Sequence, residues 1–446
     1  MTDAHTINVA TPSNRHSSGA GTPRLEVWLV IATLVTIISL PGLARVFRTN
    51  ERRDFEAEWL SARNYFANVA VYEPRDESVR RYPDGPVLRG LVGGETNPHP
   101  PTSILVTLPV GLLTYANAFF AWNVVSLMAL VTSLLLISRS LSITWNAARV
   151  LRVYSLALLC SPLNAQTYHG QLNLLLLIMI VGAWAADRRG GAATAGILLG
   201  AATVIKLFPG LLFIFPALQR RWRVLAWGGL TMGVLTLATV ATLGTSAFRD
   251  YFATSAPTIS EWRSAWGNLS LFGLWSKLFD PSARQAAGLV NPVWRNETIA
   301  RFATVASDLA LLAVLAYTVA RARSRPQRDV AFSLAVIVTL LVSPVLWSHY
   351  LVLLLLPIVV LWTTLPASSA LRWAVGIMAC VLWINPGIWW LLFVPDYAEI
   401  GGRLTMSPWN TMTALSIPTY ALLGLFVAGV AASRELHVGA APEDQG

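Results

Sequence analysis

Long apolar runs separated by short polar segments dominate the chain from residue 25 onward. A helix needs roughly 20 apolar residues to cross the hydrocarbon core of a bilayer. The pattern predicts about twelve membrane spans, at residues 25–46, 116–138, 150–167, 170–186, 191–206, 208–218, 223–244, 301–321, 329–345, 349–366, 371–393 and 411–433. Pro209 and Gly210 interrupt the fifth and sixth of these, which we interpret as two short helices. We therefore predict an all-α polytopic membrane protein.

Polar segments mark the parts of the chain that we expect outside these spans. Residues 1–24 are rich in Ser, Thr and Gly and predict a disordered cytoplasmic tail, and residues 434–446 predict a second one. The first apolar run is too long for the core of a cleavable signal peptide. Residues 25–433 would form one transmembrane domain with two long outer loops, 47–115 and 245–300. The first of these loops contains helical patterns too short to span, which we expect to lie in the membrane interface.

Arginine clusters in the short loops predict the orientation of the chain. Basic residues accumulate in cytoplasmic loops, and with twelve spans four such clusters fall on one side, together with both termini. These clusters lie at 139–152, 187–189, 219–223 and 321–328. A fifth cluster, Arg45, Arg48, Arg52 and Arg53, falls on the outer side instead. We interpret this exception as a candidate site for an anion.

Composition agrees with a membrane protein and excludes several other classes. The chain is 54% hydrophobic and only 13% charged, whereas soluble domains are about 25% charged. A net charge of +10 would suit a nucleic-acid partner, but the basic residues lie between apolar runs, so we predict none. Cys160 and Cys380 lie inside apolar runs and behave as small hydrophobic residues. The sequence contains no metal-ligand spacing and no nucleotide-binding motif, so we predict neither a metal nor a cofactor.

Ionisable residues beside the spans are the first candidates for chemistry, since such groups are costly near lipid. Asp54 follows the first span and could act as a general base towards a hydroxyl. Its neighbour Arg53 would keep it ionised, because an opposite charge lowers a carboxyl pKa. The structural alternative is that Asp54 caps the following helix. Glu56 and Glu58 compete with it for the same role.

Further polar residues fall at the outer ends of other predicted spans. His169, Gln171 and Asn173 open one helix, where anions and hydroxyl groups are favoured. Lys206 ends an apolar helix and cannot easily extend to the cytoplasm, so it would suit a phosphate or a structural ion pair. Asn268 lies in the second outer loop and is weaker evidence.

His349 completes this set of candidates. It lies between two aromatic residues, Trp347 and Tyr350, at the junction of two predicted spans. A histidine in this position could transfer a proton or contact an anion, or it could simply be a satisfied interfacial side chain. All of these candidates map to the outer side of the membrane, which predicts one site on that side.

In order along the chain, these motifs resemble a known family. They are Asp54, Pro100–Pro101, Gly170 to Asn173, Lys206 to Pro209, Asn268 to Ser270, and Ser343 to His349. This set resembles the polyprenol-phosphate-sugar-dependent glycosyltransferases of the GT-C class. It most resembles family GT87, which contains actinobacterial α-mannosyltransferases of phosphatidylinositol mannoside and lipomannan synthesis. Two positions depart from the family pattern: His99 stands where a Tyr is frequent, and Leu269 where a Gln is frequent.

The resemblance implies a GT-C-type helical bundle and an inverting transfer of a sugar, mannose by analogy. The sugar would pass from a polyprenyl-phosphate donor to a lipid-linked glycan acceptor on the extracytoplasmic side of the cell membrane. It implies Asp54 as the base, with His349 as the alternative. Lys206, His349 and Arg53 would hold the phosphate, and His169, Gln171, Asn173 and Asn268 would bind sugar or phosphate oxygens.

Two other functions remain open from the residues alone. A transporter or flippase of lipid-linked glycans would carry charged groups near the middle of the membrane, often with inverted repeats. The sequence shows no such repeat. A non-catalytic membrane partner with the same fold is the second alternative.

Overall fold

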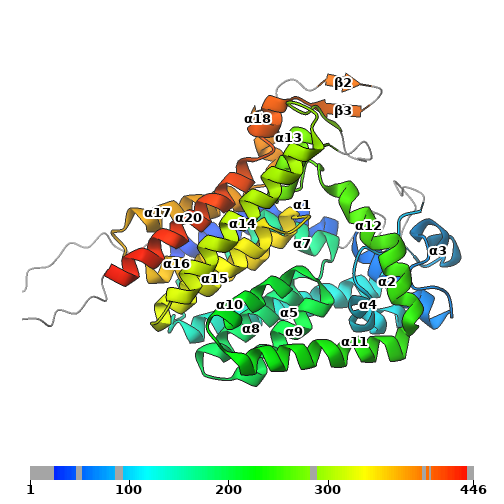
Figure 1. The fold of residues 1–446 in the computed structure, drawn as a ribbon, viewed down its shortest axis with the longest axis horizontal. Helices are drawn as coiled ribbons and strands as arrows, with labels where there is room; N and C mark the ends of the chain where they lie inside the picture. The colour runs from blue at the N-terminus through cyan, green and yellow to red at the C-terminus, as the bar shows by residue number, and fades with distance from the viewer. Residues whose placement is uncertain are drawn as a thin grey trace, which may run out of the picture.

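The computed structural model describes residues 25–46, 53–85, 94–281, 289–393, 398–400 and 403–438. Within these residues the chain is almost entirely helical (Figure 1). The tail predicted at 1–24 lies outside the described residues, as do Arg48 and Arg52 of the outer arginine cluster. Of the second tail, predicted at 434–446, residues 439–446 lie outside them, whereas residues 434–438 continue the last helix.

The first helices form one long helix and a cap of short ones. Their bounds are α1 Leu25–Val46, α2 Phe55–Phe66, α3 Arg75–Arg81, α4 Pro101–Thr107 and a 3-10 turn η1 at Leu108–Leu112. In Figure 1, α2, α3 and α4 lie together at one end of the bundle, beside the end of α11. The predicted short helices of the first long loop are thus present.

The middle of the chain forms most of the helical bundle. Its elements are α5 Tyr115–Ser140, α6 Ala147–Leu159, α7 Ser161–His169, α8 Asn173–Arg188, α9 Ala192–Ile205, η2 Phe208–Phe213, α10 Ile214–Leu218 and α11 Trp222–Asp250. Short turns follow: η3 Tyr251–Ser255, α12 Ala256–Thr258, η4 Ile259–Trp262 and α13 Leu271–Phe279.

The last part of the chain packs against this bundle. It contains α14 Glu297–Arg321, α15 Arg325–Leu341, η5 Ser348–Leu354, α16 Leu355–Thr364, α17 Ala370–Trp383, α18 Pro386–Phe393, α19 Pro408–Met412 and α20 Ile417–Val438. Helix α15 lies at the centre, with every side chain from Asp329 to Leu341 buried. It meets α8 through Trp184, whose Nε1 donates to Asp329 Oδ1 at 2.9 Å.

Five described helices are long and apolar enough to cross a membrane, or seven if two bent pairs each count as one span. The five are Leu25–Ala44, Tyr115–Ser140, Trp222–Trp262, Glu297–Arg321 and Pro408–Leu436. The prediction of a polytopic helical membrane protein is confirmed, but the described helices do not confirm twelve spans. The difference arises because several predicted spans are divided: residues 150–167 break at Cys160, and 191–218 contains three short helices.

A small sheet is an addition to the predicted helical fold among the described residues. Strand β1 (Leu289–Val290) pairs in parallel with β3 (Arg403–Met406), which pairs antiparallel with β2 (Ala398–Ile400). In Figure 1, β2 and β3 lie beyond α13 and α18. Strands of two to four residues are too short to leave the alternating pattern that identifies a strand in a sequence.

The break between α7 and α8 positions the candidate site. The two helices meet at 119°, and Gly170 between them has φ +63, which favours glycine. A Cβ atom at this position would lie 2.8 Å from both Phe55 and Phe119. Any larger residue would therefore push α2 and α5 away from the helix break.

Candidate active site

Asp54 stands at the start of α2 and faces the break between α7 and α8. It makes no capping hydrogen bond to its own helix, so the structural role considered from the sequence is not supported. Instead, Gln171 Nε2 donates to Asp54 Oδ2 at 2.7 Å, and His169 Nδ1 lies 3.5 Å from the same oxygen. The Asp54 side chain keeps 45% of its accessible surface, so a ligand can reach the carboxylate.

The charge on Asp54 follows from these neighbours. Burial alone would raise the pKa of the carboxyl group, but the His169 and His349 imidazoles and the hydrogen bond from Gln171 outweigh that effect. Together they hold the pKa of Asp54 well below its usual range. The site therefore contains an ionised carboxylate that is accessible to a ligand.

Lys206 lies on the other side of Gln171. Its Nζ donates to Gln171 Oε1 and to Asn173 Oδ1, both at 3.1 Å, and lies 4.2 Å from the centre of the Tyr350 ring. The lysine is only 3% exposed. Among the described residues no carboxylate lies within ion-pair distance of Nζ, so the structural ion pair considered from the sequence is not found.

Asn173 connects this group to His349. Its Nδ2 donates to the backbone oxygen of His349 at 3.3 Å and to Gln166 Oε1 at 3.0 Å. The His349 ring centre lies 5.7 Å from that of His169. His349 Nε2 is buried and has no hydrogen-bond partner in the described part of the chain. A buried unpartnered nitrogen is costly, which suits a group that awaits a ligand.

Arg53 is buried at the edge of the site. Its guanidinium carbon lies 4.3 Å from the Phe119 ring centre and 5.0 Å from that of Tyr168. These cation–π contacts hold the arginine between α5 and α7. The structure thus brings together all but one of the predicted site residues: Arg53, Asp54, His169, Gln171, Asn173, Lys206 and His349.

Asn268 is the exception, because its polar atoms contact the surrounding loops and not this group of residues. Its Nδ2 contacts three backbone oxygens, including that of Pro344 at 3.1 Å. Its Oδ1 accepts from Ser270 and from the backbone nitrogen of Leu346 at 3.0 Å. These bonds saturate a side chain that is fully buried. Asn268 therefore supports the loop that leads to His349.

Some residues of this site were not singled out from the sequence. Gln166 Nε2 donates to the backbone oxygen of Gln171, so it fixes the helix break. Tyr350 provides the aromatic face under Lys206. Glu58 was considered only as a competitor of Asp54, yet it binds His99, which was noted only as a departure from the family pattern. The signal for such roles is three-dimensional, because the partners lie on different helices.

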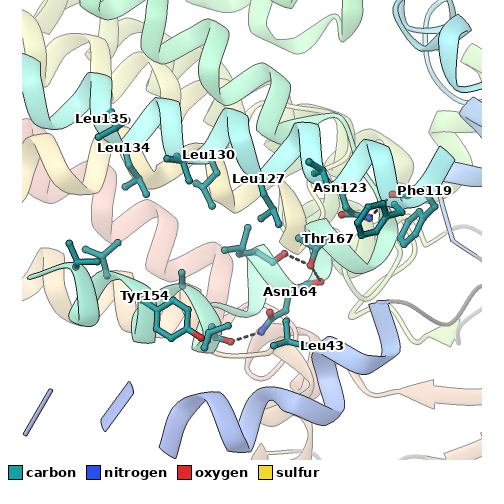
Figure 2. A pocket seen from close by; sticks show the side chains of 18 of the residues that line it. Leu43, Phe119, Asn123, Leu127, Leu130, Leu134, Leu135, Tyr154, Asn164 and Thr167 are labelled. Atoms are coloured by element: carbon teal, nitrogen blue, oxygen red, sulfur yellow. Dashed lines mark hydrogen bonds between the residues drawn. The ribbon is translucent and has the colours of Figure 1, made fainter. Parts of the chain in front are cut away.

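An apolar groove of about 820 Å³ adjoins the site (Figure 2). Leu127, Leu130 and Leu134 of α5 form one wall. Tyr154 of α6 lies on the opposite side, and Phe119 lies at the end where Arg53 stacks on its ring. The groove therefore leads from an apolar surface to the buried charges of the site.

A membrane-embedded helical bundle with an accessible carboxylate, a buried lysine and an apolar groove has the features of an enzyme that acts on lipid-linked substrates. Residues 97–344, more than half of the chain, match the sequence profile of Glycosyltransferase family 87. The chain belongs to this family, as the motifs predicted.

Several characterised relatives resemble the chain at low identity. A polyprenol-phosphate-mannose-dependent alpha-(1-2)-phosphatidylinositol mannoside mannosyltransferase of Mycolicibacterium smegmatis is 24% identical over 86% of this chain and 84% of its own length. A pentamannoside mannosyltransferase of Mycobacterium tuberculosis, also polyprenol-phosphate-mannose-dependent, is 24% identical over 72% of this chain and 64% of its own. The solved structure of ArnT from Cupriavidus metallidurans in the apo state also resembles the chain. The match covers 92% of this chain and 77% of the ArnT chain, at 16% identity and a TM-score of 0.37.

Proposed function

We propose that this glycosyltransferase transfers a sugar, mannose in the first instance, from a polyprenyl-phosphate donor to a hydroxyl group of a lipid-linked glycan. The observation that supports this most directly is the pairing of an ionised, accessible Asp54 with the buried cation of Lys206 beside an apolar groove. The activities for which the mycobacterial relatives are named support mannose as the sugar and phosphatidylinositol mannosides as the acceptor class.

In this mechanism Asp54 accepts the proton of the acceptor hydroxyl. The hydroxyl oxygen attacks C1 of the donor sugar, and the bond from C1 to the phosphate oxygen breaks, so the configuration at C1 inverts. The electron pair stays on the phosphate, where Lys206, His349 Nε2 and Arg53 stabilise the added charge. Asp54 is favoured over His349 as the base because its carboxylate is accessible, whereas the His349 side chain is 5% exposed.

The remaining polar residues hold these groups in place. Gln171 donates to Asp54 and accepts from Lys206, so it fixes the distance between the base and the cation. Asn173 supports Lys206 and the backbone of His349. His169 lies beside Asp54 and can share the proton that the carboxylate accepts.

The groove of Figure 2 would receive the polyprenyl tail of the donor. Its wall on α5 runs from Ala116 to Leu135, which is about 28 Å at a rise of about 1.5 Å per residue. One extended prenyl chain fits such a groove with its phosphate at the Phe119 end. The phosphate would then reach Arg53 without leaving the membrane.

The proposal includes an orientation of the chain in the membrane. The arginine-rich turns after α8 and α10 and before α15 would face the cytoplasm with both termini, and the site would face outward. A tag at either terminus should resist protease added from outside intact cells. Digestion of both tags from that side would contradict the proposed orientation.

The function is tested with membranes that carry the full chain. They are given polyprenyl-phosphate-linked radiolabelled mannose and a phosphatidylinositol mannoside acceptor, and the labelled lipid product is measured. Transfer that depends on both substrates supports the proposal. A broad panel of polyprenyl-phosphate sugars without any transfer would contradict it and favour a transporter or a non-catalytic partner.

A further inference from the structure

A second carboxylate–histidine pair lies one helical turn from the first. Glu58 is four residues after Asp54 on α2, so both carboxylates project from the same face, separated by about 6 Å along the axis. Glu58 contacts His99 Nδ1 through Oε1 and accepts a bond from Thr107 through Oε2 at 3.2 Å. Two of the three imidazoles in and beside the site, those of His169 and His99, thus each lie against a carboxylate at the start of α2.

His99 is fixed in place more firmly than a surface histidine. Its backbone nitrogen donates to Asn97 Oδ1 at 2.9 Å, and its backbone oxygen accepts from the Tyr72 hydroxyl at 2.6 Å. Asn97 is held in turn by α2, through the backbone oxygen of Ala57 at 3.2 Å. These contacts occupy Nδ1 and the backbone of His99 and leave Nε2 for another partner. A carboxylate on one nitrogen of a histidine orients the other nitrogen for a ligand.

The charged groups around His99 indicate which ligand would bind its Nε2 atom. Lys206 lies within electrostatic range of both Glu58 and Asp54, and His349 lies within range of His99. A phosphodiester placed near two carboxylates is repelled unless cationic donors lie between them. Lys206 lies between them as one such donor, and the Nε2–H of His99, oriented by the contact of Nδ1 with Glu58, supplies a further hydrogen bond.

We propose that His99, oriented by Glu58, binds the donor phosphate together with Lys206. This inference rests on the proposed function and deepens it. The Asp54–His169 pair would face the acceptor hydroxyl, and the Glu58–His99 pair would face the leaving phosphate, on opposite sides of the sugar. When the bond from C1 to oxygen breaks, the phosphate gains a negative charge that His99 Nε2–H stabilises as a hydrogen-bond donor.

The two amide substitutions of His99 separate this role from a purely structural one. His99→Asn keeps an amide nitrogen near the position of Nδ1, so it can still bind Glu58, but it has no group at the position of Nε2. His99→Gln places an amide nitrogen near Nε2 instead. A phosphate ligand predicts that Gln retains more function than Asn, whereas a structural role predicts the reverse.

The experiment measures binding of undecaprenyl monophosphate and of undecaprenol to the purified full chain in detergent. Wild type is expected to prefer the monophosphate, and His99→Asn to reduce that preference about tenfold or more, with Glu58→Gln intermediate. Asp329→Asn breaks another buried ion pair, with Arg188, and should leave the preference unchanged. In steady-state assays His99→Asn should raise the KM for the donor and not that for the acceptor.

Two results would overturn the inference. One is a folded His99→Asn protein that prefers the monophosphate as wild type does. The other is a rise in the acceptor KM alone, which would place His99 on the acceptor side. Should His99→Asn not fold, Glu58→Gln provides the test instead, and a folded Glu58→Gln protein with the preference of wild type would overturn the inference. A wild-type protein that transfers no sugar and does not distinguish the two lipids would instead remove the proposed function, and this inference with it.

Discussion

The Asp54 carboxylate and the Gln171 amide lie 117 positions apart in the sequence and meet at 2.7 Å. The same amide accepts a hydrogen bond from Lys206 through its oxygen. One neutral side chain thus stands between the anion and the cation of the site. In a direct ion pair the Asp54 carboxylate and the Lys206 amine would bind each other. Here each group contacts Gln171 instead and can still bind a substrate.

The first prediction concerns Asp54. Asp54→Asn should lower the rate of sugar transfer by roughly 10²–10⁴-fold, the usual contribution of a general base. The amide keeps a hydrogen-bonding group near Gln171 and His169, so the protein should still fold. Initial rates with saturating donor and acceptor measure the effect. Asp84→Asn alters an exposed acid that pairs with Arg63 and should keep full activity. Full transfer by folded Asp54→Asn would remove Asp54 as the base.

The second prediction concerns Lys206. Lys206→Met should raise the KM for the donor by about 10–100-fold, because hydrogen bonds to a charged group contribute about 1.5–3 kcal/mol. Lys206→Arg should retain part of the affinity. Lys277 provides a matched control, since it is also fully buried and its Nζ donates to the backbone oxygen of Asn268 at 2.9 Å. Equal effects of Lys206→Met and Lys277→Met on the donor KM would indicate loss of structure instead of a ligand.

The third prediction is a pH effect. Because the pKa of Asp54 is held well below its usual range, the base should stay ionised from neutral pH down through pH 5. His169→Gln removes the main charge that lowers this pKa while burial still raises it. The pKa of Asp54 should then rise, and the loss of kcat/KM on the acid side should begin at a higher pH than in wild type. An identical acid limb in both proteins would show that His169 does not act on Asp54.

The fourth prediction separates a loop-supporting role of Asn268 from its predicted role as a ligand. Asn268→Ala removes a side chain whose nitrogen and oxygen both bind the surrounding loops. Loss of a buried, saturated amide should lower the free energy of unfolding by roughly 2–3 kcal/mol. The KM for the donor should stay the same in the folded fraction. Thermal unfolding and donor titration separate the two effects, and a raised donor KM at unchanged stability would restore Asn268 as a ligand.

The sequence was sufficient for the class of fold, and most of the candidate site residues that it indicates lie close together in the structure. Apolar runs identify membrane helices because lipid demands them, and the cost of an ionisable group near lipid identifies Asp54 and Lys206. The number of spans was harder to predict, because apolar composition does not reveal where a helix bends. Gly170 was noted only as part of a motif, whereas in the structure it stands at a 119° bend and packs against Phe55 and Phe119.

The residues that sequence reasoning missed share a physical cause. Glu58 and His99 are 41 positions apart in the sequence, and no local sequence pattern indicates that they contact each other. Asn268 looked like a ligand because its residue type suits a sugar, yet the structure uses every polar atom for loop contacts. A residue type indicates what chemistry is available, whereas only the surrounding contacts decide whether a ligand can use it.

The last prediction concerns the apolar groove, whose occupant should be recognised by length and not by polar groups. Ala157 lies on α6 and lines the groove together with the leucines of α5. Ala157→Trp should fill part of the groove and raise the KM for a long-chain polyprenyl-phosphate mannose several-fold. A donor with a prenyl chain too short to reach Ala157 should be used equally well by both proteins, because its phosphate and sugar meet an unchanged site. Val234→Trp provides the control, since Val234 lies on α11, is 54% exposed and is outside the groove. Equal losses with long and short donors would mean that the tail lies elsewhere and that Ala157→Trp disturbs α6 itself.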